Sequence, residues 1–443
     1  MEQTNKKSGG MIAIVTMFAL YAMCGFVTYL AAPAGAVWQE QPGINGSNAL
    51  GMMGNMMNFL AYLLMGYPAG SLLQRIGYKK TALLATGSGA AGILIQIASG
   101  YLKLDNIAGI PAAWFVYLFG ALVSGASNCL LNTVICPMLN QIVGGGKKGN
   151  QLNLAGSACN SVCAAAAPIL LGSVVGQITK NTQFSDISGV LFAAAGVFVL
   201  ATVIISMLPI ANPTSRPTTG VVYERNALSF RHCLLGVIGI FLYMGIEAGI
   251  PTTMMQWLRA EAGPLGGGAS AMQVATWMSG GVMIMMLIGR LTGAAIGGLV
   301  SPRTMLLTAS GGALVLVIAG LMMQSVTIPF NVQVAEETGA VVAKTLQVPI
   351  TAFCFVATGI FVSVMWGVIF NLSTEGLGKY TEQASGLFMM MVVGGGIIPF
   401  LQNWIADKWG FMWAYVVPAA CLAYLFVYAL AFTKNVNTDI KVD

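Results

Sequence analysis

The chain alternates between long apolar runs and short polar segments. A helix needs about 20 mostly apolar residues to cross a bilayer, and twelve runs reach that length. The pattern therefore predicts six membrane-spanning helices, a polar interval and six more helices. The predicted helices cover 11–37, 48–73, 81–101, 112–138, 150–176 and 189–209 in the first half, and 232–256, 271–298, 304–324, 346–372, 384–405 and 412–433 in the second.

The polar interval runs from Ala211 to Arg231 and contains NPTSRPTTG, which is the composition of a linker. It divides the chain into an N-terminal six-helix bundle at 1–210, a cytoplasmic linker at 211–231 and a C-terminal six-helix bundle at 232–443. The predicted fold class is an all-α membrane protein built from two bundles.

The two halves also share a sequence pattern. Gly66 to Ala90 reads GYPAGSLLQRIGYKKTALLATGSGA, and Gly289 to Ala313 reads GRLTGAAIGGLVSPRTMLLTASGGA. Aligned without a gap, Gly66 falls on Gly289 and Lys80 on Arg303. A repeat at half the chain length is typical of transporters made of two structurally similar halves.

Composition excludes a soluble protein. Hydrophobic residues make up 57% of the chain and charged residues 8%, whereas soluble domains carry about 25% charged residues. The eight cysteines show no metal-ligand spacing, so we expect no metal site. The single histidine and the absence of the G-x-x-x-x-G-K-S/T spacing argue against an enzyme and against ATP-driven transport. We expect no cofactor and no cleaved signal peptide.

The basic residues predict the orientation. If the N-terminus is cytoplasmic, fifteen of the twenty lysines and arginines fall inside. Because cytoplasmic loops are enriched in basic residues, both termini are predicted to be cytoplasmic. The formal net charge of +6 follows from this asymmetry and requires no nucleic-acid partner. The five outer basic residues are Lys103, Lys180, Arg259, Lys344 and Lys408.

The turn after the second predicted helix resembles the G-x-x-x-D-R-x-G-R/K-K signature of the major facilitator superfamily. The resemblance implies the major facilitator fold, with a cytoplasmic conformational gate at this turn. Gln74 replaces the acid of the signature, so the gate is expected to be weaker here. The gate residues implied by the two related turns are Gly70, Gln74, Arg75, Gly77, Lys79, Lys80, Arg290 and Arg303.

Three longer segments resemble the fucose/glucose–galactose:proton symporter family. They read FLYMGIEAGIP (241–251), FNLSTEGLGKY (370–380) and LNLAGSACNS (152–161). The resemblance implies a sugar substrate, a coupling proton and the bacterial inner membrane, and we expect a monomer. Acids that the family carries in helices 1 and 4 fall on Ala32 and Asn132 here, so the coupling ion, proton or sodium, stays open.

Glu247 is the one carboxylate deep in a predicted helix, near the midplane of the seventh. Ionisable groups at this depth are usually functional, and burial favours the neutral form that a proton carrier must reach. We therefore predict Glu247 as the proton-coupling residue. The alternative is a hydrogen-bonded carboxyl that holds helices together. No lysine or arginine lies deep in a predicted helix, which favours a neutral or cationic substrate.

Amide side chains suit sugar hydroxyls, because each offers a donor and an acceptor, and aromatic rings offer a stacking face. Any single asparagine could instead link two helices. The predicted substrate-binding residues are Asn132, Asn160, Asn58, Asn128, Tyr29, Tyr243, Gln256, Trp277, Trp366 and Asn371.

Taken together, these features predict a secondary transporter that imports a monosaccharide or related neutral polyol by alternating access, coupled to protons. Three alternatives stay open. A drug/proton antiporter exporting lipophilic cations could also use one buried acid and a methionine-rich cavity. The sugar carrier could be uncoupled or sodium-coupled. A sensor that no longer transports would agree with the missing acids.

Overall fold

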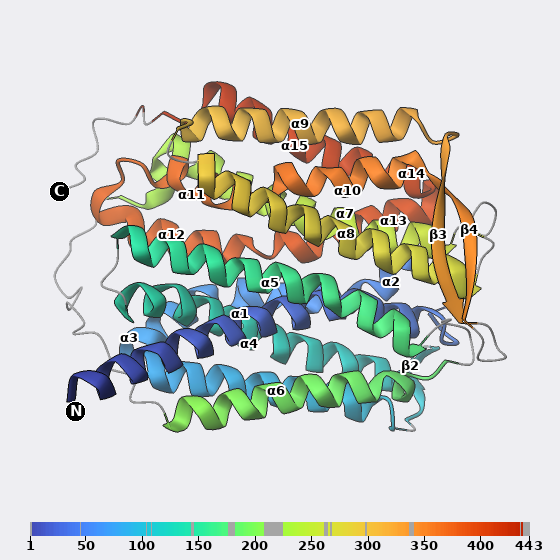
Figure 1. Ribbon diagram of the computed structural model, residues 1–443, viewed down its shortest axis with the longest axis horizontal. Coiled ribbons are helices and arrows are strands. Elements are labelled where there is room, and N and C mark those ends of the chain that lie inside the picture. The colour runs from blue at the N-terminus through green and yellow to red at the C-terminus, as the bar shows by residue number, and fades with distance from the viewer. Residues whose placement is uncertain are drawn as a thin grey trace.

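The computed structural model describes residues 2–44, 46–102, 104–107, 109–142, 146–175, 182–207, 225–260, 265, 268–296, 299–335, 341–434 and 436. Its helices lie side by side along the long axis of the molecule (Figure 1). In the first half these are α1 (Glu2–Gln39), α2 (Asn48–Gly51), α3 (Met53–Ser99), α4 (Ala112–Ile142), α5 (Gly146–Val175) and α6 (Ser188–Met207). Two very short strands, β1 (Asn106–Ile107) and β2 (Ile110–Pro111), pair before α4.

The second half has more helix breaks. Its helices are α7 (Arg231–Ala260), α8 (Gly268–Ile296), α9 (Pro302–Met322), α10 (Ile350–Val362), α11 (Met365–Thr374), α12 (Thr381–Met391), α13 (Gly394–Trp409), α14 (Phe411–Ala414) and α15 (Val416–Ala431). An antiparallel hairpin, β3 (Thr327–Ala335) and β4 (Val341–Pro349), joins α9 to α10. Three short 3₁₀ turns lie at Phe184–Ile187, Ala227–Ser229 and Gly378–Tyr380.

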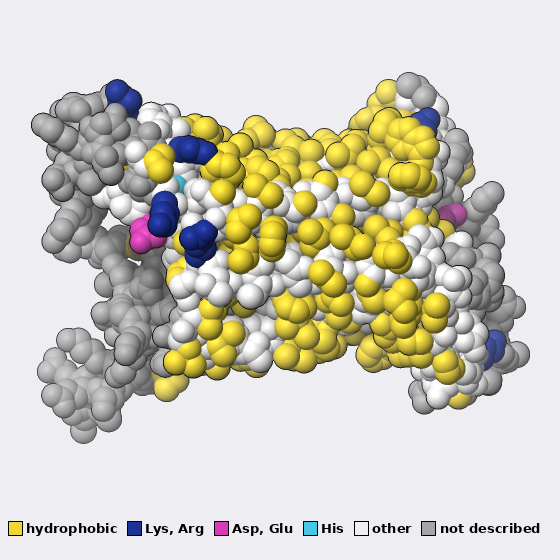
Figure 2. All heavy atoms as spheres, turned by 90° about the horizontal axis from the view of Figure 1, so that it is seen from above, with side chains coloured by type: hydrophobic (Ala, Val, Ile, Leu, Met, Phe, Trp, Pro, Cys, Tyr) yellow, Lys and Arg dark blue, Asp and Glu magenta, His cyan; other side chains and the backbone are white. Residues whose placement is uncertain are grey.

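The helices account for the twelve predicted spans. Eleven helical stretches within the described residues are long and apolar enough to cross a membrane, and the shorter apolar stretch Ala155–Leu171 in α5 supplies the fifth span. Figure 2 shows apolar side chains across the middle of one face, with the charged side chains toward the two ends. A polar end, an apolar belt and a second polar end are the surface that a bilayer requires.

Buried apolar side chains form two clusters that follow the two halves of the chain. Tyr29, Met244 and Trp366 pack against both clusters, so they mark the boundary between the bundles. The first part of the predicted linker, 211–224, lies outside the described residues.

Equivalent glycines support the internal repeat. A Cβ added at Gly89 of α3 would lie 2.3 Å from Phe198 Cε1 in α6 and 2.6 Å from Ser127 Oγ in α4. One added at Gly312 of α9 would lie 2.6 Å from Phe361 Cε1 in α10. In each half the third span thus approaches the fourth at the same glycine, because only a hydrogen atom fits there.

The structure differs from the predicted elements in several places, and the second and twelfth predicted spans are interrupted at Met52 and Tyr415. The second and third predicted spans run together in α3 across a turn at Gly77, whose φ of 79° favours glycine. The tenth and eleventh spans are each broken, at Ser363–Val364 and at Val392–Val393. The β3–β4 hairpin was not predicted. Its strands TIPFNVQVA and VVAKTLQVP are rich in β-branched residues, which favour extended backbone.

Candidate substrate and ion-coupling site

An ion pair lies where the two bundles meet. Glu247 is near the middle of α7, and its Oε1 is 3.1 Å from an Arg290 guanidinium nitrogen of α8. Both side chains are mostly buried, with 12% and 17% of their surface exposed. The sequence predicted no lysine or arginine deep in a helix, but the position of a residue along its helix does not fix how far its side chain reaches. Arg290 starts nearer the end of its helix, but its long side chain extends to the carboxylate.

Arg290 also connects the bundles. Its guanidinium donates to the carbonyl oxygen of Ser157 at 3.0 Å and to the hydroxyl of Ser161, both on α5 of the first half. Arg290 is therefore a tether from α8 to α5, and Glu247 supplies the charge that orients it. The sequence analysis assigned Arg290 to the cytoplasmic gate motif, and in the structure its guanidinium contacts α5 and α7.

Three of the predicted aromatic residues surround this pair. Tyr243, one turn before Glu247 and fully buried, lies close enough to interact with the carboxylate. Tyr29 of α1 lies close enough to Glu247 and Arg290 to interact with both charges. The ring of Trp366 lies 6.1 Å from that of Tyr243. These residues bring α1, α7 and α11 together at one place between the bundles.

A second polar cluster lies between α7 and α13, and among Gln402, Asn403 and Gln256 only Gln256 was predicted from the sequence. Gln402 is fully buried, and neither atom of its amide has a hydrogen-bond partner among the described residues. A Cβ added at Gly249 would lie 2.0 Å from Gln402 Oε1, so the amide lies directly against α7. Asn403 donates to Thr253 Oγ1 at 3.2 Å, and Gln256 Nε2 lies 3.8 Å from Met52 Sδ.

The amide oxygens of Gln256 and Asn403 are also without a partner in the described part of the chain. Unpaired buried amides are expensive, at about 1–3 kcal/mol each, and a ligand or a different conformation can pair them. The sequence signal was present: QN at 402–403 interrupts an apolar span.

Asparagines of the first half mostly link helices of their own bundle. Asn132 of α4 donates to the Tyr62 hydroxyl at 2.8 Å, and Asn160 of α5 donates to the Tyr21 carbonyl oxygen at 3.0 Å. Asn128 donates to Thr28 Oγ1 at 3.2 Å. This is the helix-linking alternative that was open for each of them.

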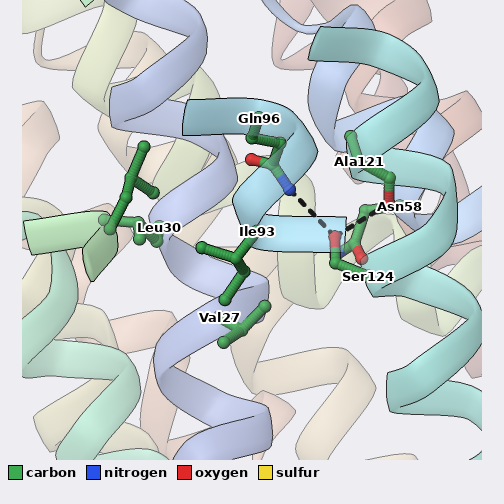
Figure 3. Close-up of a pocket in the computed structure, with 8 residues that line it drawn as sticks. Val27, Leu30, Asn58, Ile93, Gln96, Ala121 and Ser124 are labelled. Atoms are coloured by element: carbon green, nitrogen blue, oxygen red, sulfur yellow. Dashed lines mark hydrogen bonds between the residues drawn. The ribbon is translucent and has the colours of Figure 1, made fainter. Parts of the chain in front are cut away.

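Asn58 lies inside the first bundle rather than between the bundles. It lines a small cavity of about 10 Å³ together with Gln96, Ser124 and five apolar residues (Figure 3). Gln96 donates to Ser124 Oγ at 3.1 Å, while both amide atoms of Asn58 lack a partner among the described residues. This space fits one water molecule and excludes a sugar.

Two predicted substrate residues point elsewhere. Trp277 is 47% exposed and shares its stripe of α8 with the exposed Ile284, Ile288 and Leu291, so it faces the lipid side. Asn371 is exposed near the end of α11, away from the middle of the bundle. Both predictions are corrected. When one side of a helix faces lipid and the other faces protein, both sides are apolar. The hydrophobic pattern of the sequence then does not predict which residues face the protein.

In each of the two basic turns, a basic side chain donates to carbonyl oxygens at the end of the last span of the same bundle. Lys79 donates to the carbonyl oxygen of Ser206 in the last turn of α6 at 2.8 Å. Arg303 donates to the carbonyl oxygens of Ala429, at 3.0 Å, and Leu430 in the last turn of α15. Each turn thus holds the last span of its own bundle by its free carbonyl groups. Arg75 and Lys80 are exposed, and the side chain of Gln74 lies outside the described residues.

Among the residues that the structure describes, no group of three or more His, Cys, Asp or Glu side chains lies close enough to hold a metal ion.

Comparisons with known proteins agree with this architecture. No family model matches the chain. Over 442 residues it is 26% identical to a glucose/galactose transporter of Brucella abortus, covering 98% of this chain and 97% of that protein. The crystal structure of the Escherichia coli fucose:proton symporter superposes with a TM-score of 0.64 at 17% identity, covering 96% and 100% of the two chains. The crystal structure of a D-xylose–proton symporter superposes with a TM-score of 0.67 at 10% identity, covering 96% of this chain and 98% of that one.

The fold is therefore that of a major facilitator transporter, with multiple membrane-spanning helices in two bundles. The resemblance predicted from the sequence is confirmed: the chain is similar to the glucose/galactose transporters and to the fucose:proton symporter. All of these relatives are transporters, in agreement with the prediction that the chain is not an enzyme.

Proposed function

We propose that the chain imports a monosaccharide or related neutral polyol by alternating access and couples the movement to protons at Glu247. The sugar substrate is supported by the names of the relatives. The observation that carries the coupling is the Glu247–Arg290 pair, because it lies between the bundles that must move against each other.

Protonation of Glu247 would act on the contact between the bundles. The ionised carboxylate attracts the guanidinium and holds it in the direction of α5. A proton removes that charge and leaves Arg290 to be oriented by Ser157 and Ser161 alone. The proton thereby changes the relative stability of the two bundle arrangements, which is the requirement for coupling.

The surroundings suit a neutral sugar. The ion pair has no net charge, Tyr29, Tyr243 and Trp366 supply ring surfaces, and Gln402 and Gln256 supply unpaired amide atoms. The antiporter alternative is less favoured, because Arg290 beside Glu247 repels a cation.

We place the protein in the bacterial inner membrane with both termini cytoplasmic. Figure 1 supports the placement of both termini on the same side of the membrane, since α1 begins and α15 ends at the same end of the molecule. The relatives of known source are bacterial.

The test is sugar transport in proteoliposomes with Glu247→Gln. The isosteric amide cannot ionise, so uphill uptake driven by a pH gradient should be lost while sugar exchange at equal concentrations continues. Glu375→Gln is the matched control, because Glu375 is an exposed acid at the end of α11. Full pH-driven accumulation by Glu247→Gln would rule out the coupling role. Transport of cationic dyes and of no sugar would favour the antiporter.

A further inference from the structure

A carboxylate of the second bundle caps a helix of the first. Asp407, near the end of α13, accepts hydrogen bonds from the backbone N–H groups of Asn48 and Ala49, both at 3.0 Å. It also accepts from the Ser47 hydroxyl at 2.9 Å and from the Asn48 amide at 2.7 Å. Four donors on one carboxylate make charge-assisted bonds, which are stronger than neutral ones.

A second contact between the bundles lies beside it. Arg259, in the last turn of α7, donates to the Ala36 carbonyl oxygen at 3.1 Å and to Gln39 Oε1. It also lies 3.6 Å from the Glu40 carboxylate. All three partners are at the end of α1, in the first bundle.

The two contacts are joined. Gln39 Nε2 donates to Asn48 Oδ1 at 2.9 Å and to the Gly46 carbonyl oxygen at 2.9 Å. One hydrogen-bonded network therefore runs from Arg259 through Gln39 and Asn48 to Asp407. Its two ends belong to the second bundle, and its middle is the α1–α2 turn of the first.

The network lies at one end of the molecule only. The end of α1, the start of α2 and the end of α13 lie toward the β3–β4 hairpin, opposite the end where α1 begins (Figure 1). With cytoplasmic termini this is the outer end. A central site can open outward only if the bundles separate there, and separation must break every contact from Arg259 and Asp407 to the first bundle.

We propose that the Arg259–Gln39–Asn48–Asp407 network is an outer gate that holds the extracellular side closed, with Asp407 as its main positioning residue. The proposal rests on the alternating access of the proposed function but not on the identity of the sugar. Neither Arg259 nor Asp407 touches the Glu247–Arg290 pair in the described contacts, so the gate sets which side is open and leaves the coupling chemistry unchanged.

The experiment measures the outer opening directly. Spin labels at Leu104→Cys and Val326→Cys, two exposed sites near the outer ends of the two bundles, report their separation when the native cysteines are replaced. Asp407→Ala should raise the ratio of long to short distances about tenfold, because the bonds favouring the closed form are lost. Ser47→Ala removes one of the four bonds and should give a smaller shift of the same sign. Asp105→Asn, an exposed outer acid, should give none.

An unchanged distance distribution in both Asp407→Ala and Ser47→Ala would overturn the gate. If Asp407→Ala does not fold, the Ser47→Ala result decides alone. The measurement needs no substrate, so a failure to find a transported sugar counts against the proposed function and leaves the gate intact. Normal sugar transport with unchanged distances counts against the gate alone.

Discussion

Buried polar groups are used differently in the two bundles. In the first, Asn128, Asn132 and Asn160 each donate to a neighbouring helix of the same bundle. In the second, the amide of Gln402 has no partner among the described residues, and Arg290 reaches from its own bundle to α5.

This difference indicates that hydrogen bonds within a bundle and contacts between the bundles have different roles. Hydrogen bonds inside one bundle stabilise it in every state of the cycle. Groups that are paired across the boundary must change partners when the bundles move apart. The Glu247–Arg290 pair belongs to the second half, and the first half contributes Ser157 and Ser161 to its contacts.

The largest expected effect comes from breaking the ion pair on one side. Arg290→Met keeps most of the side-chain volume but leaves the Glu247 carboxylate unpaired in a mostly buried place. Losing one partner of a buried pair costs about 3–5 kcal/mol. We expect a large drop in the unfolding temperature of the purified protein and loss of coupled uptake.

The matched control for this prediction is the double variant Glu247→Gln with Arg290→Met. Because it removes both charges, most of the lost stability should return, while coupled uptake stays absent. Equal unfolding temperatures for Arg290→Met and the unchanged protein would show that the ion pair does not stabilise the fold. The second bundle would then not differ from the first by a stabilising buried ion pair.

A smaller effect is expected at the unpaired amide of the second bundle. Gln402→Leu should raise the KM for sugar exchange about 5- to 150-fold, the equivalent of about 1–3 kcal/mol for one buried hydrogen bond. The unfolding temperature should not fall, because no partner in the described structure is lost.

Asn58→Leu is the matched variant for Gln402→Leu. Asn58 is also buried and unpaired within the described residues, but it faces the one-water cavity inside the first bundle. Its KM should stay within about twofold of the unchanged protein, as for most substitutions away from a site. A raised KM for Asn58→Leu with a normal KM for Gln402→Leu would show that the sugar contacts the unpaired amide of the first bundle and not that of the second.

Sequence and structure agree where the signal is local. Twelve apolar runs predicted twelve spans, because a run of sufficient length needs no partner to be recognised. Glu247 and its neighbour Tyr243 were found for the same reason: a carboxyl inside an apolar run stands out, and one helical turn places both on one face.

What was missed depends on helix rotation and on distant pairing. Arg290 and Glu247 meet only because the rotation of α8 about its axis directs the Arg290 side chain toward α7. Trp277 lies on the same helix but faces the lipid side, a choice that an apolar helix does not record in its sequence. The gate residue Asp407 binds a turn some 360 positions earlier, and nothing near it in the chain predicts that contact.

The smallest expected effect tests the first bundle, at a residue that the sequence predicted to bind substrate. Asn132→Ala removes the donor to the Tyr62 hydroxyl and should lower the free energy of unfolding by about 1 kcal/mol. Tyr62→Phe should lose a similar amount and the double variant little more, because the two share one bond. Sugar KM should not change in any of the three. If Asn132→Ala instead raises KM more than about fivefold, while Tyr62→Phe does not, Asn132 contacts the sugar, and the first bundle shares the chemistry now assigned to the second.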